Sequence, residues 1–412
     1  MPVKVGFAEA DVTPAVPCPI GGYGDHLAEE VLGPPLFVRS VTVIGEDGTE
    51  WALSAGDLIG YDREEICLPV IEALRSEGYT GGVMLTASHT HSGPHTRFSQ
   101  TYMREKADDA YLERLRSALV STILEARRNS RPAEVAVGRT YIRENVNRRV
   151  NLPDGTHHYL PHEKNLYPQA TGPVDEELGV IAIRDARTRK PIATIVNYTA
   201  HALTIGNYKW VVSADYPGVL AQELSERTGG PAMFTQGACG NVHPIGFEKG
   251  PERMKELGHS LAEAAYKVWQ SLTYSAAAPV AYAEENVELP TQERFMTQEK
   301  FRWHPKYKGL KSRAGSVHAG RLGDVIFVGV PGELFVEIGF AIKKQSPAPY
   351  TYILYNTNAY LSYIPVPKAY AEGGYEPNAT LSGPESASIV EEAAGRLTRQ
   401  VWKAAEASRG RT

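Results

Sequence analysis

The stretch LTASHTHSGP, residues 85–94, ends an apolar, β-prone run with two histidines at positions i and i+2, His89 and His91. On a strand, side chains at this spacing face the same side. The Ser-Gly-Pro that follows turns the chain away, so we expect the pair at a strand end. Two neutral imidazoles held together there make half of a zinc or iron site. A short H-x-H motif also occurs in solvated loops, so residues elsewhere must decide between these interpretations.

The composition is that of an ordinary folded protein and excludes several kinds of partner. Of the 412 residues, 42% are hydrophobic and 22% are charged. No apolar run approaches the roughly 20 residues that a membrane span needs, so we expect no transmembrane segment. The net charge of -5 comes without a long basic run, which argues against nucleic acid as a partner. Because residues 1–6 lack the pattern of a signal peptide, we expect a cytoplasmic protein.

The cysteines restrict the possible metal ligands. Cys18, Cys67 and Cys239 are widely spaced and odd in number. They therefore indicate neither a disulfide framework nor a thiolate zinc site. A metal ion in this chain needs histidine, carboxylate or phenolate ligands instead.

Strand and helix patterns alternate on both sides of the opening stretch. A strand at 51–54, a helical pattern at 66–74 and a strand at 82–86 make a β-α-β unit that delivers His89. Two later strands, 178–183 and 192–198, are nearly continuous in apolar residues, as buried central strands are. The polar segment 294–313 is the nearest thing to a domain boundary. We predict one α/β domain of mixed β-sheets flanked by helices, with further helices at 108–129, 216–227, 251–272, 333–344 and 389–404.

A long polar loop, residues 147–175, interrupts this alternation. Loops of this length inside a compact domain tend to be lids or binding loops, so we assign it to the substrate side. Arg148 lies at its start. Such arginines are usually solvated, but a buried guanidinium there could pair with an oxyanion or a carboxylate.

Three other places combine a strand end with a side chain that can bind a metal. His201 follows the buried strand 192–198, although a single histidine is more often a core or loop residue. Glu333 follows a Pro-Gly at the end of an apolar strand, where it suits either a ligand or a helix start. The tyrosines at 355–375 usually indicate packing, because a phenol must ionise to bind a metal well. The glycine-rich segment 236–244 lacks the spacing of a nucleotide-binding loop.

Taken together and in order, these motifs resemble the neutral ceramidase family, specifically its N-terminal metallohydrolase domain. The motifs are H-T-H-S-G-P at 89–94, the single histidine at 201, P-G-E at 331–333 and Y-x-x-Y at 360–363. The resemblance runs from D-V-T-P at 11–14 to Y-E at 375–376. It implies a single large metallohydrolase domain over residues 1–412, with the metal at the C-terminal ends of strands and without the immunoglobulin-like domain of the full-length ceramidases.

The resemblance also implies roles for individual residues. One Zn²⁺ would be held by four side chains, and three more would act around it. The implied ligands are His89, His201, Glu333 and Tyr363. His91 would carry protons, while Arg148 and Tyr370 would line the reacting centre.

One segment departs from the family pattern. Where the ceramidases have a serine in a G-D-V-S-P-like segment, this chain reads G-N-V-H-P at 240–244, with His243 in the place of the serine. No serine role carries over. His243 either contacts the substrate, which we favour, or joins the metal shell beside a second ion. Together with the missing secretion signal, this departure favours an acyl substrate other than ceramide.

These residues predict a zinc-dependent hydrolase that cleaves a linear amide bond in a small-molecule or lipid-like N-acyl compound. Zinc with three or four protein ligands and an open position activates water and polarises a carbonyl oxygen. Two alternatives stay open. The substrate could be an ester or a carbohydrate-linked acyl compound, or the chain could be a non-catalytic member of the fold.

Overall fold

An eight-stranded mixed sheet forms the first layer of the fold. The computed structural model describes residues 3–22, 26–96, 108–152, 157–159, 169–292 and 309–409. Strands β5–β6 and β12–β13 run parallel, and the other neighbours run antiparallel. In spatial order the strands are β13 (Ala232–Gln236), β12 (Pro191–Tyr198), β11 (Glu177–Asp185), β7 (Arg131–Tyr141), β1 (Lys4–Asp11), β4 (Phe37–Ile44), β5 (Glu50–Gly56) and β6 (Gly82–Ala87).

The interior strands of this sheet owe their burial to apolar, largely β-branched sequences. The strand β12, PIATIVNY, is buried at every residue after its first, and β11, ELGVIAIRD, at every residue but one. Both faces of such a strand are covered, which requires apolar residues at consecutive positions. The strands predicted at 178–183 and 192–198 are therefore confirmed.

A second sheet of four strands packs against one face of the first. Its order is β15 (Val280–Pro290), β16 (Ser312–Leu322), β17 (Val325–Gly329) and β19 (Tyr350–Leu354). The parallel strands β17 and β19 are joined by the helix α6 (Val336–Gln345), because parallel neighbours need a crossover connection. Trp51 lies between the sheets, with its ring 6.1 Å from that of Phe327 and its indole N–H donating to the carbonyl of Arg321 at 3.3 Å.

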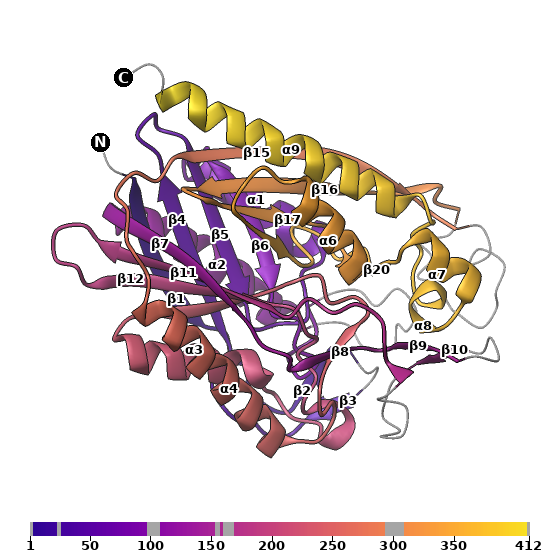
Figure 1. Cartoon of the computed structure of the whole chain (residues 1–412). Coiled ribbons are helices and arrows are strands. Elements are labelled where there is room, and N and C mark those ends of the chain that lie inside the picture. Colours follow the sequence, from indigo (N-terminus) through magenta and orange to yellow (C-terminus); the bar gives the residue numbers. More distant parts are fainter. Residues whose placement is uncertain are drawn as a thin grey trace.

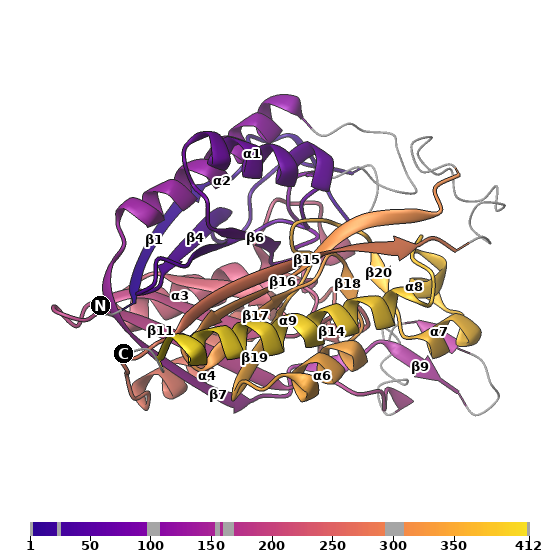
Figure 2. The same ribbon diagram turned by 90° about the horizontal axis from the view of Figure 1, so that it is seen from above.

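Helices cover the outer faces of both sheets and complete the layers (Figures 1 and 2). On the large sheet, α1 (Leu68–Ser76) and α2 (Asp109–Arg128) cover β1 and strands β4 to β6. The helices α3 (Asp215–Thr228) and α4 (Pro251–Gln270) cover strands β11 to β13. On the small sheet lie α6 and the last helix, α9 (Ser386–Arg409). The predicted α/β class, with mixed sheets flanked by helices, is confirmed.

Short elements gather at one side of the layers (Figure 1). The described part of the predicted loop 147–175 contains two of the short strands. Residues 153–156 and 160–168 of that loop, and residues 294–308 of the predicted polar segment 294–313, lie outside the described residues. The short elements are β2 (Cys18–Ile20), β3 (His26–Ala28), β8 (Asn145–Asn147), β9 (Arg149–Asn151), β10 (His157–Tyr159), β14 (Val242–Pro244), β18 (Glu333–Leu334), β20 (Tyr363–Ile364), α7 (Pro367–Glu372) and α8 (Tyr375–Asn378).

The predicted start of a helix at Glu333 is wrong. Glu333 and Leu334 form the strand β18, and α6 begins only at Val336. The reason is a tertiary contact: β18 pairs in parallel with β20, which places Glu333 opposite Tyr363. This pairing brings two of the predicted metal ligands to the same place.

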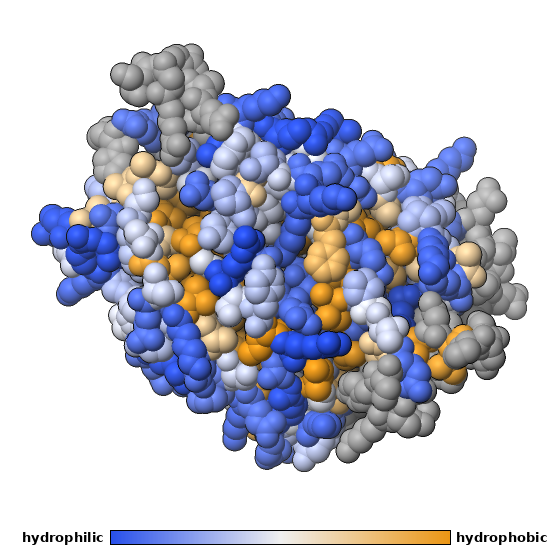
Figure 3. All heavy atoms as spheres, viewed as in Figure 1, coloured by the Kyte–Doolittle hydropathy of each residue, from blue (hydrophilic) through white to orange (hydrophobic). Residues whose placement is uncertain are grey.

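Polar side chains cover much of the face seen in Figure 3, with apolar patches between them. Among the residues that the structure describes, no helix combines the length and the apolar character that crossing a membrane requires.

The inter-sheet contact of Trp51 gives a test of the fold. We expect Trp51→Ala to lower the free energy of unfolding by about 3–5 kcal/mol, because it leaves a cavity between the sheets. Chemical denaturation measures this change. Leu68→Ala, at a side chain that is 43% exposed, is the control, and we expect it to change stability by no more than about 0.5 kcal/mol. Equal effects of the two substitutions would contradict the described packing.

Candidate metal centre

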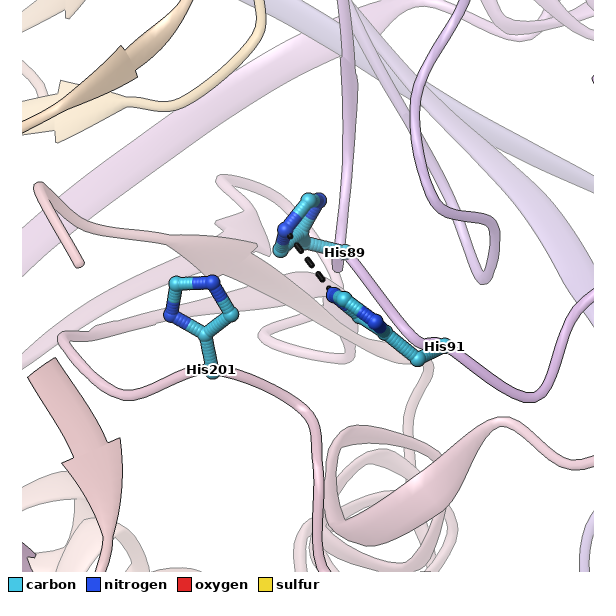
Figure 4. A group of neighbouring side chains, drawn as sticks. All are labelled: His89, His91 and His201. Atoms are coloured by element: carbon cyan, nitrogen blue, oxygen red, sulfur yellow. Dashed lines mark hydrogen bonds between the residues drawn. The ribbon is translucent and has the colours of Figure 1, made fainter. Parts of the chain in front are cut away.

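Three histidines from two strand ends lie together (Figure 4). His89 and His91 follow β6, and His201 follows β12. Each offers a ligand atom, and these atoms all lie within 4.8 Å of one another. His89 and His201 are fully buried, whereas His91 is partly exposed. The predicted approach of His201 to the histidine pair is therefore real, and the group can bind a metal ion.

Backbone carbonyls fix the protonation of two of these rings. The Nδ1 atom of His89 lies 2.7 Å from the carbonyl oxygen of Ile59, and that of His201 lies 3.1 Å from the carbonyl oxygen of Val242. A carbonyl can only accept, so each Nδ1 carries the proton and each Nε2 keeps its lone pair. Burial, together with the charge of Arg148, lowers the pKa of His201 to about 4. At neutral pH this imidazole is therefore uncharged and able to bind a metal.

Glu333 directs its carboxylate at the same two nitrogens. Its Oε2 atom lies 3.4 Å from Nε2 of His89 and 3.6 Å from Nε2 of His201. The hydroxyl of Tyr355 donates to Oε2 at 2.9 Å, and that of Tyr360 donates to Oε1. These two phenol donors keep the buried carboxylate hydrogen-bonded, which a buried anion requires. Two imidazole nitrogens and an ionised carboxylate are a donor set that suits zinc.

Tyr363 lies beside Glu333 through the pairing of β20 with β18. Its side chain is buried. The guanidinium carbon of Arg148 lies 5.3 Å from the centre of its ring. The fourth predicted ligand is thus in the same region, although its role as a ligand stays a prediction.

Arg148 is fully buried next to His201 and is held by several acceptors. Its Nε donates to Glu376 at 2.8 Å, and its Nη2 donates to the carbonyl of Gly240 at 2.6 Å. Its Nη1 lies 2.6 Å from Nε2 of His243 and 3.4 Å from Nε2 of His201. A buried guanidinium bound in this way is a fixed positive charge at the edge of the histidine group.

His243 faces Arg148. Because the guanidinium can only donate, Nε2 of His243 accepts from it, and this bond uses the lone pair of that nitrogen. The ring of His243 stacks on that of Phe247 at 4.3 Å and lies 5.2 Å from the ring of His201. This arrangement does not favour His243 as a metal ligand, and its contact with the substrate stays a prediction.

Comparison with known proteins identifies the family. A family model described as neutral/alkaline non-lysosomal ceramidase, N-terminal, matches residues 3–249, which is more than half of the chain. The chain belongs to this family. A neutral ceramidase of Pseudomonas aeruginosa is 22% identical over 492 aligned positions, which cover 93% of this chain and 70% of that protein. The resemblance to neutral ceramidases that the motifs indicate is therefore confirmed.

Two solved structures share the fold of this ceramidase-family chain. The crystal structure of neutral ceramidase from Pseudomonas aeruginosa has a TM-score of 0.78 at 18% identity and covers 97% of this chain and 74% of that one. A structure described as a ceramidase complexed with C2 has a TM-score of 0.81 at 17% identity, with coverage of 98% and 76%. At these identities the likeness shows the fold.

The two phenols that follow Tyr363 are placed differently in the ceramidase-family site. The hydroxyl of Tyr370 donates to the carbonyl of Ser382 at 2.7 Å. The ring of Tyr375 lies 5.6 Å from that of Tyr363 and 5.8 Å from the guanidinium carbon of Arg148. Tyr375 is thus a second candidate for the role that the resemblance gives to Tyr370.

Glu376 is a site residue that the sequence analysis missed. It is fully buried and bridges two guanidinium groups, with Oε1 2.8 Å from Nε of Arg148 and Oε2 2.8 Å from Nη1 of Arg149. Adjacent buried arginines need a carboxylate partner. That need was the available signal. The resemblance included Y-E at 375–376, but it gave Glu376 no role, and no local pattern paired this residue with the arginines.

The bridge makes Glu376 important for stability. We expect Glu376→Gln to lower the free energy of unfolding by about 3–5 kcal/mol, because it removes the carboxylate that pairs with buried Arg148 and leaves Arg149 with Glu372 as its anionic partner. Chemical denaturation at neutral pH checks this. Glu285→Gln, in the exposed pair with Arg396, is the matched control, with an expected loss of no more than about 1 kcal/mol. A smaller loss for Glu376→Gln than for the control would show that the bridge is dispensable.

The same bridge predicts a pH dependence. Burial alone would raise the pKa of Glu376, but Arg148 and Arg149 outweigh it and lower this pKa below its ordinary value of 4.5. The bridge therefore stabilises the fold fully above about pH 4.5, and this contribution is lost as the pH falls toward the lower folded-state pKa. We expect the stability difference between wild type and Glu376→Gln to be constant near neutrality and to shrink in acid. A difference that grows in acid would contradict this sign.

Proposed function

We propose that this ceramidase-family protein is a zinc-dependent hydrolase that cleaves a linear amide bond in a lipid-like N-acyl compound. The observation that carries the proposal is the convergence of Nε2 of His89, Nε2 of His201 and the carboxylate of Glu333. The name of the Pseudomonas relative, a neutral ceramidase, supports an amide substrate. Ceramide therefore belongs among the candidate substrates, in spite of the histidine at position 243.

The donor set favours one zinc ion. Zinc takes imidazole nitrogens and carboxylate oxygens in four-coordinate sites. His89, His201 and Glu333 would hold it, with Tyr363 as the fourth ligand. When bound, the ion supplies a Lewis acid that polarises a carbonyl oxygen and lowers the pKa of a water molecule to about 7.

His91 is the residue that we assign to proton transfer. Its Nε2 atom lies 3.2 Å from Nε2 of His89, so the ring edge faces the centre of the site. In this arrangement Nε2 of His91 donates to the lone pair of His89. With that lone pair used by a metal, the other tautomer of His91 would present an unprotonated Nε2, which would act as a general base, take the proton of the attacking water and return it to the leaving amine. Its partial exposure allows the proton to exchange with solvent.

Arg148 is the group that we assign to the carbonyl oxygen. Negative charge develops on that oxygen during the attack, and a buried, immobile cation stabilises it without reorganising. The bonds to Glu376 and Gly240 keep the guanidinium in place. Tyr375 would donate to the same oxygen, or Tyr370 would do so if its hydroxyl left the carbonyl of Ser382. His243, held by Arg148, would contact the substrate.

Metal content and substrate class can be tested together. Elemental analysis of the purified protein is expected to find about one zinc per chain, and chelation is expected to abolish hydrolysis. A panel of N-acyl amides of different chain lengths, ceramide included, is compared with matched esters and acylated sugars. If the esters or acylated sugars are cleaved faster than the amides, the protein is an ester or acyl-sugar hydrolase instead. If the zinc-loaded protein cleaves none of these compounds, the chain is a non-catalytic member of the family.

Substitutions of the two neighbouring histidines separate their roles. We expect His89→Ala to lose both the metal and the activity. We expect His91→Ala to keep the metal while turnover falls by roughly 10²–10⁴-fold, the usual contribution of a general acid–base. Metal analysis and initial rates are measured on the same samples.

His259→Ala serves as the control, because this histidine is exposed on α4 and pairs with Glu223. It is expected to retain wild-type metal content and rate. Loss of the metal in His91→Ala would make His91 a ligand and not the proton carrier.

A further inference from the structure

One buried side chain joins the two segments that carry His89 and His201. Gln236 is the last residue of β13 and is completely buried. Its amide nitrogen donates to the carbonyl of Ser88 at 3.0 Å and to the carbonyl of Ala200 at 2.6 Å. Its amide oxygen accepts the N–H of Ala200 at 3.2 Å. Ser88 and Ala200 are the residues immediately before the two histidines.

These bonds fix the two peptide groups that lead into the histidines. Gln236 holds the carbonyl side of each group. On the other side, the N–H of His89 donates to Leu58 at 2.9 Å and the N–H of His201 donates to Val242 at 3.1 Å. Each peptide plane is therefore held at both edges. Because the plane determines where the next side chain leaves the backbone, the same amide nitrogen sets the position of both imidazoles.

The main chain joins the two segments just after the histidines, where Thr90 and Ala202 form a parallel bridge and the N–H of His91 donates to the carbonyl of Ala202 at 3.4 Å. The ladder of the large sheet does not link the peptides that precede the histidines. In the strand order, β6 and β13 are the two opposite edges of the eight-stranded sheet, so their ends are not neighbours in its ladder.

The main chain of Gln236 reaches a third segment as well, because its carbonyl accepts the N–H of Tyr355 at 3.1 Å. The hydroxyl of Tyr355 in turn donates to Glu333. One residue thus contacts the segments of His89 and His201 and the tyrosine that binds Glu333.

We propose that Gln236 is a positioning residue of the metal centre, whose side-chain amide sets the separation of His89 and His201. This inference rests on the proposed metal-dependent function. The chemistry is specific to a primary amide at this length of side chain, because the nitrogen uses both of its protons on carbonyl oxygens. A carboxylate would face two carbonyl oxygens with no proton for either. A thioether would remove this donor from the carbonyl of Ser88 and leave the carbonyl of Ala200 with the hydroxyl of Tyr216, which donates to it at 2.6 Å.

Two substitutions of Gln236 and one matched control test the proposal. Gln236→Glu keeps the shape and reverses the hydrogen-bonding character, whereas Gln236→Met keeps the length without a charge. The control is Asn197→Asp, a buried amide on the neighbouring strand. The Asn197 amide donates to the carbonyls of Thr235 at 3.2 Å and Ile353 at 3.0 Å, away from the peptides that precede the histidines.

Three quantities are measured on each full-length protein. They are the zinc dissociation constant by competition with a chelating dye, the visible absorption bands of the Co²⁺-loaded protein, and the thermal midpoint of the metal-free protein. We expect both Gln236 variants to bind zinc about 10–100-fold more weakly, the usual effect of losing a partner that orients ligands, and to shift the cobalt bands. We expect Asn197→Asp to lower the thermal midpoint while leaving the zinc dissociation constant and the cobalt bands unchanged.

Two results would overturn the inference alone. In the first, the Gln236 variants have the same zinc dissociation constant and cobalt bands as wild type. In the second, Asn197→Asp loses as much zinc affinity as the Gln236 variants do. If Gln236→Glu does not fold, Gln236→Met decides by the same measurements. A wild-type protein that binds neither ion is a different result, because it overturns the proposed function and this inference with it.

Discussion

Two buried, ionised carboxylates, Glu333 and Glu376, determine which groups must surround them in the site. Such groups are costly to bury unless their oxygens are hydrogen-bonded or paired with charge. Glu333 receives two phenol hydroxyls and faces two imidazoles, and Glu376 bridges two guanidinium groups. Arg148 approaches His201, which approaches Glu333. The two carboxylates therefore belong to one electrostatic network, and the short elements around them are the scaffold that keeps each oxygen satisfied.

Features that are written locally in the sequence could be predicted, and features made by distant pairing could not. The strand ends before His89 and His201 follow from apolar runs that stop at turn-forming residues. Glu333 looked like a helix start, because nothing within its own segment shows that residues 363–364 pair beside it. Glu376 lies 228 positions from its partner Arg148. No local pattern encodes a contact at that separation.

Several non-glycine residues near the site have left-handed backbone conformations, which such residues rarely adopt. The predicted ligand His89 has a φ angle of 64°, and so does Ser362, which precedes the predicted ligand Tyr363. Asn358 has a φ of 55°, and its side chain and main chain both bond to the edge of β6 at Leu85. Left-handed conformations of this kind cost of order 1–3 kcal/mol each and persist where the surrounding structure determines them. The loop after β19 is thus shaped by the sheet that it covers.

The pairing of β18 with β20 has a consequence for how this chain matures. The proposed ligand set is drawn from positions 89, 201, 333 and 363, so its members are far apart along the chain. Contacts of such high sequence separation form slowly, because the intervening loops must close first. Synthesis must also pass residue 363 before the last member exists. A metal ion would therefore bind only after the chain has folded. Free zinc would shift the equilibrium from the unfolded to the folded chain but would not speed the early steps of folding.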